Sequence, residues 1–330
     1  MVTTRRKMET KEKVLCLLYD NRGESISGEE IARMLGISRN SVWKAVNALK
    51  EDGYEITSKT NEGYMLSCES EVFNAHSVNK LTGGKYNIRF YDKLPSSNDT
   101  AKALAQAGEG EGTVIVVRSQ TNGKGRMGRS FISESENGLY FSVILKPTIP
   151  LEECALLTVM TAVATQEAIE ETSGKDCQIK WVNDIYINDR KICGILTEAS
   201  LNFENGNMNY AVVGIGINIK EDKDGFNKEI KDIAGAIFDN TPPRDYKSVL
   251  LSTILDKLFA YYNSFCVDDF IEKYREKSNI IGKDVRVYRG NKIVEGVAID
   301  IDKRARLVVK DQNGEIHSFS SGEAQVRKCK

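Results

Sequence analysis

The chain has 330 residues, with 46 lysines and arginines against 47 aspartates and glutamates, 41% hydrophobic residues and five prolines. This composition is typical of a globular protein of two or three domains, and it excludes collagen-like, fibrous and fully disordered classes. The net charge of -1 argues against a protein that coats nucleic acid over its whole surface, and it is compatible with one local basic face.

The first segment, residues 9–68, predicts a helix-turn-helix followed by a wing. Ser27 begins a helix as its N-cap, with Glu30 three residues later in a capping box. After a short turn, Ser38 begins the next helix, which runs to Leu49. Two short strands around a polar turn follow at 54–57 and 63–66.

The helix after Ser38 has the composition of a helix that enters the major groove of DNA. No acidic residue falls between residues 38 and 50, and short polar side chains alternate with cations. Such side chains read base edges and meet phosphates. We expect DNA contacts from Ser38, Arg39, Asn40, Ser41, Lys44 and, in the wing, Lys59. The alternative is a protein-interaction module with a solvated charged face, since the segment is nearly neutral overall.

Residues 73–267 alternate strands with helices, which indicates an α/β domain around a sheet. The expected strands lie at 88–91, 113–117, 139–145, 178–182, 191–198 and 210–217, and the expected helices at 98–107, 155–172 and 247–265. Short alternating strands follow at 285–288, 293–299, 305–309 and 316–319, with turns at Gly290-Asn291 and Asn313-Gly314. They predict a small C-terminal β-barrel.

Cysteine and histidine content argues against a metal site or a disulfide framework. The seven cysteines include no Cys-x-x-Cys pair, and the two histidines are His76 and His317. We therefore expect reduced thiols, structural histidines and a cytoplasmic protein. No apolar run reaches 18 residues and the first 13 residues are polar and charged, so we expect neither a membrane span nor a signal peptide.

A glycine-rich basic segment follows the strand expected at 113–117. Three glycines alternate with three cations in it, namely Gly123, Lys124, Gly125, Arg126, Gly128 and Arg129. Glycines let backbone amides approach an anion, and the cations supply charge for phosphate or carboxylate. The spacing matches neither the dinucleotide-binding glycine motif nor the phosphate loop of nucleotide triphosphatases. A flexible basic surface turn is the alternative.

Three further segments carry candidate chemistry. Lys180-Trp181-Val182-Asn183-Asp184 begins a hairpin that places Lys180 and Lys191 at one end of the sheet, unless these lysines only cover apolar surface with their stems. Gly214 and Gly216, inside an apolar strand, indicate contact with a flat ligand or a bulge. Ser96-Ser97-Asn98 either binds a ligand or only caps the next helix.

Together these four segments resemble the biotin protein ligases, specifically the bifunctional kind whose N-terminal DNA-binding domain represses biotin genes. The resemblance spans essentially the whole chain, and the 123–129 loop combined with 180–186 and 190–198 is its most specific part. It implies an α+β multidomain protein. The implied parts are a winged helix-turn-helix at 1–68, a linker at 69–80, a ligase domain with a mixed sheet, like that of class II aminoacyl-tRNA synthetases, at 81–275, and an SH3-like barrel at 276–330.

The resemblance also implies the residues that bind substrates. The biotin contacts would be Ser96, Ser97, Asn98, Gln120, Gly123, Lys124, Gly125, Arg126, Tyr140, Lys180 and Gly194. The ATP and adenylate contacts would be Lys124, Arg126, Arg129, Lys180, Asn183, Gly214, Gly216, Asn218 and Phe226. Lys180 and Arg126 would be catalytic, and Asp184 would contact either the incoming amine or Mg²⁺.

The implied reaction uses biotin, ATP and Mg²⁺ and needs no nucleophile on the enzyme. The biotin carboxylate attacks the α-phosphorus of ATP, and biotinyl-5′-AMP then passes biotin to a lysine of the biotin carboxyl carrier protein, a subunit of acetyl-CoA carboxylase, or of another biotin-dependent carboxylase. The cations neutralise the repulsion between the two anions. Operator DNA of biotin genes and, when the adenylate is bound, a second copy of the chain are the other implied partners.

Departures from the family pattern are mild. Lys124 stands where arginine is frequent, which keeps the charge and loses bidentate geometry, and Val182 replaces a common proline. Two other functions are alternatives. A repressor that binds biotin without ligating it is disfavoured by the intact Lys180 and loop, and a lipoate or octanoate ligase by the helix-turn-helix and the loop.

Overall fold

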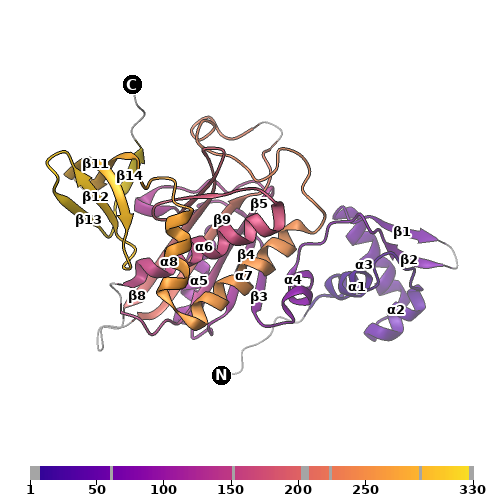
Figure 1. Ribbon diagram of the computed structural model, residues 1–330. Coiled ribbons are helices and arrows are strands. Elements are labelled where there is room, and N and C mark those ends of the chain that lie inside the picture. The colour runs from indigo at the N-terminus through magenta and orange to yellow at the C-terminus, as the bar shows by residue number, and fades with distance from the viewer. Residues whose placement is uncertain are drawn as a thin grey trace. The chain divides into compact units, whose positions relative to one another are not determined.

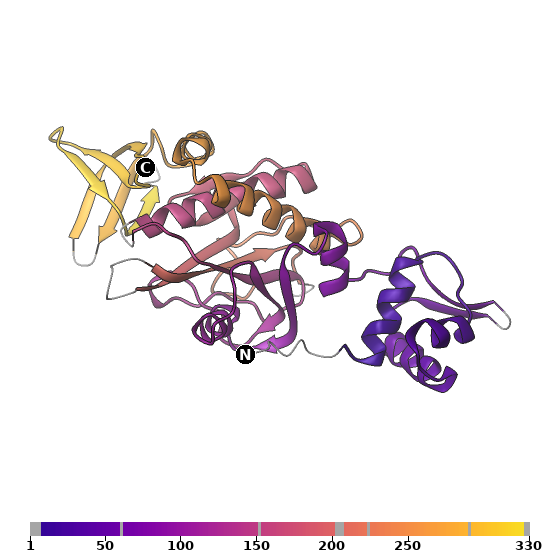
Figure 2. The same ribbon diagram turned by 90° about the horizontal axis from the view of Figure 1, so that it is seen from below.

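The computed structural model describes residues 8–59, 62–150, 153–201, 208–222, 225–289 and 292–326. The chain forms two compact units, Met1–Leu81 with Pro243–Ser248 and Thr82–Pro242 with Val249–Lys330. Figures 1 and 2 show the elements of each unit. The turn expected at Gly290-Asn291 lies outside the described residues, and the domain boundaries expected at 68, 80 and 275 stay predictions.

Three helices and a hairpin form most of the first unit (Figure 1). The helices are α1 (Thr10–Asp20), α2 (Gly28–Leu35) and α3 (Arg39–Glu51). The antiparallel hairpin consists of β1 (Ile56–Lys59) and β2 (Gly63–Leu66). Apolar side chains from all three helices and from β1 and β2 are buried in one core, among them Leu18, Ile31, Val46 and Leu66. The predicted helix-turn-helix and wing are confirmed.

Local capping explains where α2 and α3 begin and end. Ser27 Oγ accepts a hydrogen bond from the Glu30 amide at 3.1 Å, and Ser38 Oγ accepts one from the Ser41 amide at 3.1 Å. Gly36 ends α2 with a φ of 64°, a left-handed conformation that favours glycine. The turn between the two helices is therefore short and closely defined.

One helix and one distant loop of the first unit were not predicted. Helix α4 (Ala75–Thr82) lies where we expected a linker. Asp245 accepts a hydrogen bond from the Val72 amide at 3.0 Å and forms an ion pair with Arg22 at 2.5 Å. The first unit is thus built from two stretches of chain that are far apart in sequence.

A seven-stranded mixed sheet lies at the centre of the second unit, in the order β3-β4-β5-β9-β8-β7-β6. The strands are β3 (Asn87–Leu94), β4 (Thr113–Gln120), β5 (Gly138–Leu145), β6 (Gln178–Lys180), β7 (Asp184–Ile187), β8 (Arg190–Leu201) and β9 (Met208–Asn218). β3 and β4 are parallel, and every other neighbouring pair is antiparallel. The predicted mixed α/β fold is confirmed.

Helices cover both faces of this sheet (Figure 2). They are α5 (Ser97–Gln106), α6 (Cys154–Ser173), α7 (Tyr246–Ser264) and α8 (Val267–Glu276), of which α8 was not predicted. Ala101 and Ala105 of α5 pack in one cluster with Ile115 of β4 and Ile144 of β5. α6 is buried along most of its length, in accordance with a sequence that is apolar on nearly every side.

The C-terminal strands form a separate antiparallel sheet in the order β13-β12-β11-β10-β14. They are β10 (Asp284–Arg289), β11 (Lys292–Ile301), β12 (Leu307–Asp311), β13 (Ile316–Phe319) and β14 (Glu323–Val326). Its core includes fully buried side chains of β10 and β12, namely Val285, Val287, Leu307 and Val309. The predicted all-β C-terminal part is confirmed, and β14 is an addition.

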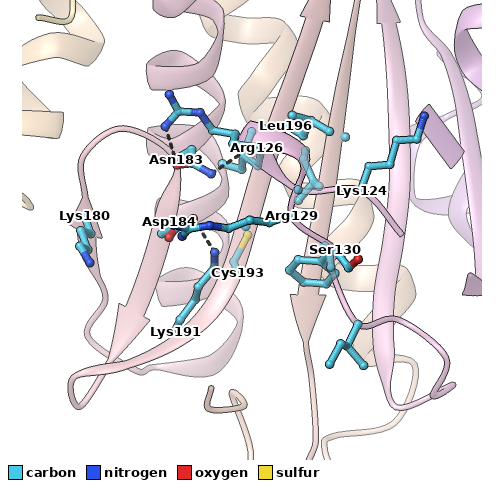
Figure 3. Close-up of a pocket in the computed structure, with 18 of the residues that line it drawn as sticks. Lys124, Arg126, Arg129, Ser130, Lys180, Asn183, Asp184, Lys191, Cys193 and Leu196 are labelled. Atoms are coloured by element: carbon cyan, nitrogen blue, oxygen red, sulfur yellow. Dashed lines mark hydrogen bonds and ion pairs between the residues drawn. The ribbon is translucent and has the colours of Figure 1, made fainter. Parts of the chain in front are cut away.

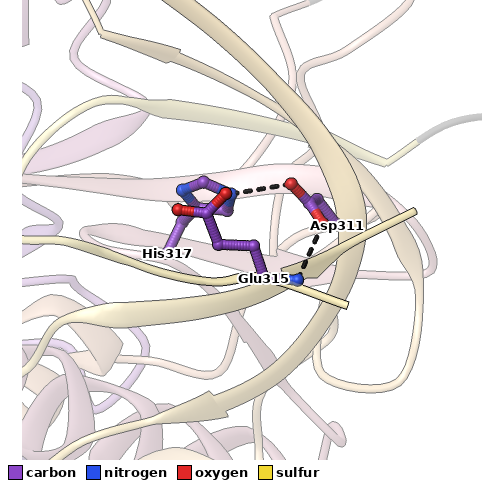
Figure 4. A group of neighbouring side chains, drawn as sticks. All are labelled: Asp311, Glu315 and His317. Carbon is purple, nitrogen blue, oxygen red and sulfur yellow. Dashed lines mark hydrogen bonds and ion pairs between the residues drawn. The ribbon is translucent and has the colours of Figure 1, made fainter. Parts of the chain in front are cut away.

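Asp311 organises the turn between β12 and β13 (Figure 4). Its Oδ1 accepts hydrogen bonds from the Asn313 and Glu315 amides, each at 2.9 Å, and its Oδ2 lies 2.9 Å from Nε2 of His317. The contact with His317 holds the pKa of the Asp311 carboxyl below its usual range. Although Asp311, Glu315 and His317 have the donor types of a metal site, Asp311 already uses both oxygens in the turn.

The described cysteines and helices bear on thiol state and on membrane insertion. Each of the six described cysteines is a free thiol. Burial raises the pKa of the Cys177 thiol to about 12, so this group stays protonated near neutral pH. In the part of the chain that the structure describes, none of the helices has the length and apolar character needed to cross a membrane.

Candidate functional site

A cavity of about 510 Å³ lies in the second unit, between the basic loop after β4, the β6–β7 segment and the glycines of β8 and β9 (Figure 3). Residues 322–325, at the start of β14, also line it. Fourteen of the predicted site residues line this one cavity: Ser96, Ser97, Asn98, Gln120, Lys124, Gly125, Arg126, Arg129, Lys180, Asn183, Gly194, Gly214, Gly216 and Asn218. The four motifs are thus brought together by the fold.

Two predicted residues lie behind the wall of this cavity rather than in it. The Gly123 carbonyl accepts a hydrogen bond from the Phe131 amide at 2.9 Å, which closes the base of the loop. The Tyr140 ring is buried with its centroid 6.3 Å from that of Phe131. Phe131 itself lines the cavity, so Gly123 and Tyr140 support the wall through it.

The apolar side chains that the loop after β9 brings to the cavity differ from Phe226, the residue that we expected there. Phe226 does not line the cavity, and its amide donates a hydrogen bond to Glu221 at 3.3 Å. Ile230 and Ile233 line the cavity instead. The adenine contact assigned to Phe226 stays a prediction, and Ile230 and Ile233 are the apolar residues of this loop that the fold brings to the cavity.

The glycines of β8 and β9 make room for two side chains. A Cβ atom on Gly216 would lie 2.6 Å from the Phe131 ring, and one on Gly214 would lie 2.0 Å from Oδ1 of Asn98. Both glycines lie in regular antiparallel pairing with β8, opposite Gly194 and Leu196. The regular pairing disagrees with a bulge at these two positions. Contact of Gly214 and Gly216 with a flat ligand stays a prediction, and both glycines line the cavity.

A buried polar network forms one end of the cavity. The Ser97 amide donates to Oε1 of Gln120 at 2.7 Å, and the Ser142 hydroxyl lies 2.6 Å from Oδ1 of Asn98. Asn98 Nδ2 donates to Glu198 at 2.9 Å. These contacts hold the Gln120 and Asn98 amides in one orientation, as specific recognition of a small polar ligand requires.

Ser96 and Ser97, at the start of α5, form different hydrogen bonds. Ser96 caps the helix, since its Oγ accepts a hydrogen bond from the Asp99 amide. Ser97 contributes its backbone and hydroxyl to the polar network, where its Oγ lies 2.8 Å from that of Ser142. Sequence reasoning missed Ser142, although a hydroxyl inside the fully buried strand β5 was a signal.

Several cations line the cavity, and most of them form ion pairs with carboxylates (Figure 3). Lys124 forms an ion pair with Asp99 at 2.7 Å, and Lys191 forms one with Asp184 at 2.7 Å. Lys191 also lines the cavity, and sequence reasoning placed it near the site without assigning it a role. These ion pairs position the ammonium groups before any ligand arrives.

Arg126 and Lys180 differ from the other cavity cations, because within the described residues neither forms an ion pair. Arg126 donates to the neutral amide oxygen of Asn183 at 3.1 Å, and Lys180 lies 5.7 Å from the centroid of the Tyr186 ring. Burial lowers the pKa of the Arg126 guanidinium, and the charge of Asp184 partly opposes this. A buried cation without a carboxylate partner is costly, which favours an anionic ligand.

The C-terminal sheet contributes directly to this site. Glu323 of β14 lines the cavity and forms an ion pair with Arg129 of the basic loop. The Trp181 indole donates to the Ala305 carbonyl at 3.0 Å, which joins the Lys180 segment to the same sheet. No local sequence signal pointed to Glu323, because its partner lies far away along the chain.

Three family models match successive parts of the chain. They are an HTH domain at 10–65, the biotin/lipoate A/B protein ligase family at 92–218 and the biotin protein ligase C terminal domain at 280–327. Their order agrees with the predicted order of a helix-turn-helix, a ligase sheet and a small C-terminal sheet.

Curated relatives and solved structures extend the likeness over nearly the whole chain. The bifunctional ligase/repressor BirA of Bacillus subtilis is 34% identical over 92% of this chain and 95% of its own, and that of Escherichia coli is 26% identical over 96% of each. The biotin protein ligase from Aquifex aeolicus in complex with biotin and ATP, 26% identical, matches with a TM-score of 0.60 over 74% of this chain and 99% of its own. The chain therefore belongs to the family of bifunctional biotin protein ligase/repressors.

Proposed function

We propose that this protein is a biotin protein ligase and a biotin-responsive repressor. It activates biotin with ATP to biotinyl-5′-AMP and transfers biotin to a lysine of the biotin carboxyl carrier protein of acetyl-CoA carboxylase, or of another biotin-dependent carboxylase. The observation that carries this proposal is one cavity that combines a fixed amide network with Arg126 and Lys180, two half-buried cations that have no carboxylate partner within the described residues.

The amide network suits the uncharged ureido end of biotin. Gln120 and Asn98 present donors and acceptors whose directions are fixed by buried neighbours. A site that pairs with the polar atoms of a ligand discriminates strongly against analogues that lack them, because its own buried groups are then left unpaired. In this assignment lipoate, which has no ureido group, makes none of these additional hydrogen bonds.

Arg126 and Lys180 suit the reacting groups of biotin and ATP. The biotin carboxylate and the ATP phosphates are both anions, so their mutual repulsion is a large part of the barrier, and fixed positive charge lowers it. Lys180, which has no ion pair to break within the described residues, would bridge the carboxylate and the α-phosphate. Arg126 would hold the phosphate with Asn183 as its support.

Mg²⁺ would supply further charge neutralisation at the ATP phosphates. Oxygen donors suit this ion, and it is commonly held by one or two carboxylates together with substrate phosphates. Asp184 fits that pattern, since its Oδ1 is buried, has no other hydrogen-bond partner within the described residues and lies 2.7 Å from Nζ of Lys191. The same carboxylate would otherwise accept a proton from the incoming lysine amine.

Repression would follow from the intermediate that the enzyme retains. Helix α3, capped by Ser38, carries Arg39, Asn40, Ser41 and Lys44, and β1 ends with Lys59. In the cytoplasm, chains loaded with biotinyl-5′-AMP would pair and present two such helices to operator half-sites of biotin genes, which makes the adenylate the corepressor. The carrier protein would compete with the second copy for the loaded enzyme.

The first test is transfer of radiolabelled biotin to a purified carrier domain in the presence of Mg-ATP. We expect transfer by the wild type, transfer slowed by about 10²- to 10³-fold in Lys180→Ala, and no competition by excess lipoate. Competition by lipoate would overturn the biotin assignment. A protein that binds biotin and labels nothing would overturn the ligase activity and leave a biotin-binding repressor.

A further inference from the structure

Trp43 is exposed in the middle of helix α3. Its exposed fraction is 55%, whereas Trp181, the other tryptophan of the chain, is 4% exposed. The core of the first unit takes Val42, Ala45, Val46 and Leu49 from this helix and does not take Trp43. A large apolar ring that stays in water stabilises the fold little, so Trp43 calls for an explanation outside the folding of the domain.

The position of Trp43 on the helix places it among the residues expected to contact DNA. Residues three or four apart lie next to each other on a helix surface, so Asn40, Arg39 and Asn47 surround it. The hydroxyls of Ser38 and Ser41 are 2.8 Å apart at the start of the helix, where they serve the cap. Trp43 is therefore the largest side chain on the part of α3 that a groove would receive.

The charges around Trp43 indicate what covers it. No carboxylate falls between residues 38 and 50, and Lys44 is exposed beside it. Lys50 reaches Oγ of Ser58 in β1 at 2.7 Å, so a cation also lies between the helix and the wing. An exposed aromatic ring among cations suits a ligand that has both negative charge and apolar atoms. DNA has both, because its phosphates are anionic and its major groove exposes the methyl groups of thymine.

We propose that Trp43 reads thymine, by packing its indole against thymine C5-methyl groups in the major groove. Thymine is the base that presents a methyl group there, so this contact distinguishes it from cytosine and from the purines. Arg39 and Lys44 then position the helix on the phosphates, while Trp43 contributes sequence preference. The inference rests on the proposed repressor function.

The first experiment selects duplexes from a randomised DNA pool with the full-length protein in the presence of biotin and Mg-ATP. Trp43→Ala should bind the selected duplex about 10- to 100-fold more weakly, the usual loss for one wrong base pair, and Trp43→Phe should lie between. Met34→Ala is the matched control, because Met34 is also apolar and 57% exposed, on α2. It should bind as the wild type does.

The second experiment replaces each thymine of the selected duplex in turn by deoxyuridine, which lacks only the methyl group. Wild type should lose affinity at one or two positions in each half-site, and Trp43→Ala should be insensitive at those same positions. The far-ultraviolet circular dichroism and thermal unfolding of Trp43→Ala should match those of the wild type, which shows that the first unit is folded. Its biotin transfer should be unchanged, because the cavity lies in the second unit.

Three results would overturn the inference. Equal affinity of Trp43→Ala and wild type, or indifference of wild type to every deoxyuridine, would remove Trp43 from base recognition and leave the repressor function intact. Failure of the wild type to select any duplex would remove the repressor function, and the inference with it.

Discussion

The cavity of the second unit and the outer face of α3 both gather cations, but they hold them differently. In the cavity, Lys124, Lys191 and Arg129 each form an ion pair with a carboxylate. On α3, the Arg39–Glu29 pair is 4.0 Å long and both side chains are largely exposed. The cavity therefore has charges fixed in direction, whereas the helix has charges that can follow a ligand.

This difference matches the size of the two ligands. A small substrate needs preorganised groups, because each ångström of misplacement weakens the transition-state contact. A long polyanion is attracted by the sum of several loosely held charges, and the interaction depends on salt through the counterions released. Loss of a single cation should thus have a large, specific effect in the cavity and a small, additive one on α3.

The largest effect should come from Lys180→Ala. We expect adenylate formation to slow by about 10²- to 10³-fold with biotin binding retained, because Lys180 is assigned to charge that develops in the transition state. Pyrophosphate exchange measures adenylate formation, and a separate titration measures biotin binding, so the two effects of the substitution can be distinguished. Lys93→Ala, at an exposed lysine of β3, is the control and should match wild type. Equal loss in both variants would contradict the assignment of Lys180 to the transition state.

Gly214→Ala should act on binding rather than on chemistry. The new Cβ would lie 2.0 Å from Oδ1 of Asn98 and push that amide out of its network. Biotin affinity should fall about 10- to 100-fold, since a disrupted buried hydrogen bond costs about 1 to 3 kcal/mol. Calorimetric titration with biotin measures this. Gly110→Ala, where an added Cβ meets nothing within 4 Å, is the control; if it weakened biotin binding as much, the steric explanation would be lost.

A smaller change is expected for DNA binding by Lys44→Ala. The slope of log affinity against log salt should fall by about 1, and affinity should drop uniformly over different duplexes. Binding titrations at several salt concentrations give both quantities, with Lys13→Ala on α1 as the control. A loss restricted to one DNA sequence would contradict the assignment of Lys44 to phosphates.

The smallest effect concerns the ion pair that holds the basic loop. Burial by itself raises the pKa of Asp99, but hydrogen bonds from Lys124 and Lys102 outweigh it, so the pKa lies below its usual value. A carboxylate with a lowered pKa stabilises the fold above its unfolded pKa of about 3.9, and this contribution is lost as the pH falls through the folded value. The difference in Tm between wild type and Asp99→Asn should therefore be greatest at neutral pH and vanish in acid. If the difference in Tm grew in acid, the pKa of Asp99 would be raised by folding rather than lowered.

Local chemistry made part of this structure predictable. Ser27 and Ser38 were placed correctly as caps because an N-cap depends on a side chain and an amide two or three residues away. Six of the seven strands of the sheet were expected, because buried apolar runs bounded by turn residues have few other conformations. Strand β7 (Asp184–Ile187) was not among them. The importance of Gly214 and Gly216 was also visible, although which atoms fill the space beside them was not.

Contacts between distant segments were beyond the reach of such patterns. Glu323 and Arg129 meet only because the C-terminal sheet packs beside the basic loop, and neither neighbourhood differs locally from an ordinary charged surface. Similarly, Ile230 and Ile233 reach the cavity while Phe226 does not. A loop with several apolar residues gives no periodicity from which to choose among them.

The ion pair of Asp245 bears on how this family could lose or gain a DNA-binding domain. Arg22 and the Val72 amide are its partners, so a chain shortened to begin after residue 81 would keep the carboxylate and lose both. Removing residues 1–81 would also expose the Asp245 carboxylate to water, so its charge would carry no burial cost, and what would be lost is the anchor of residues 243–248. A single-function enzyme derived from this sequence would therefore keep a segment before α7 whose partners are gone.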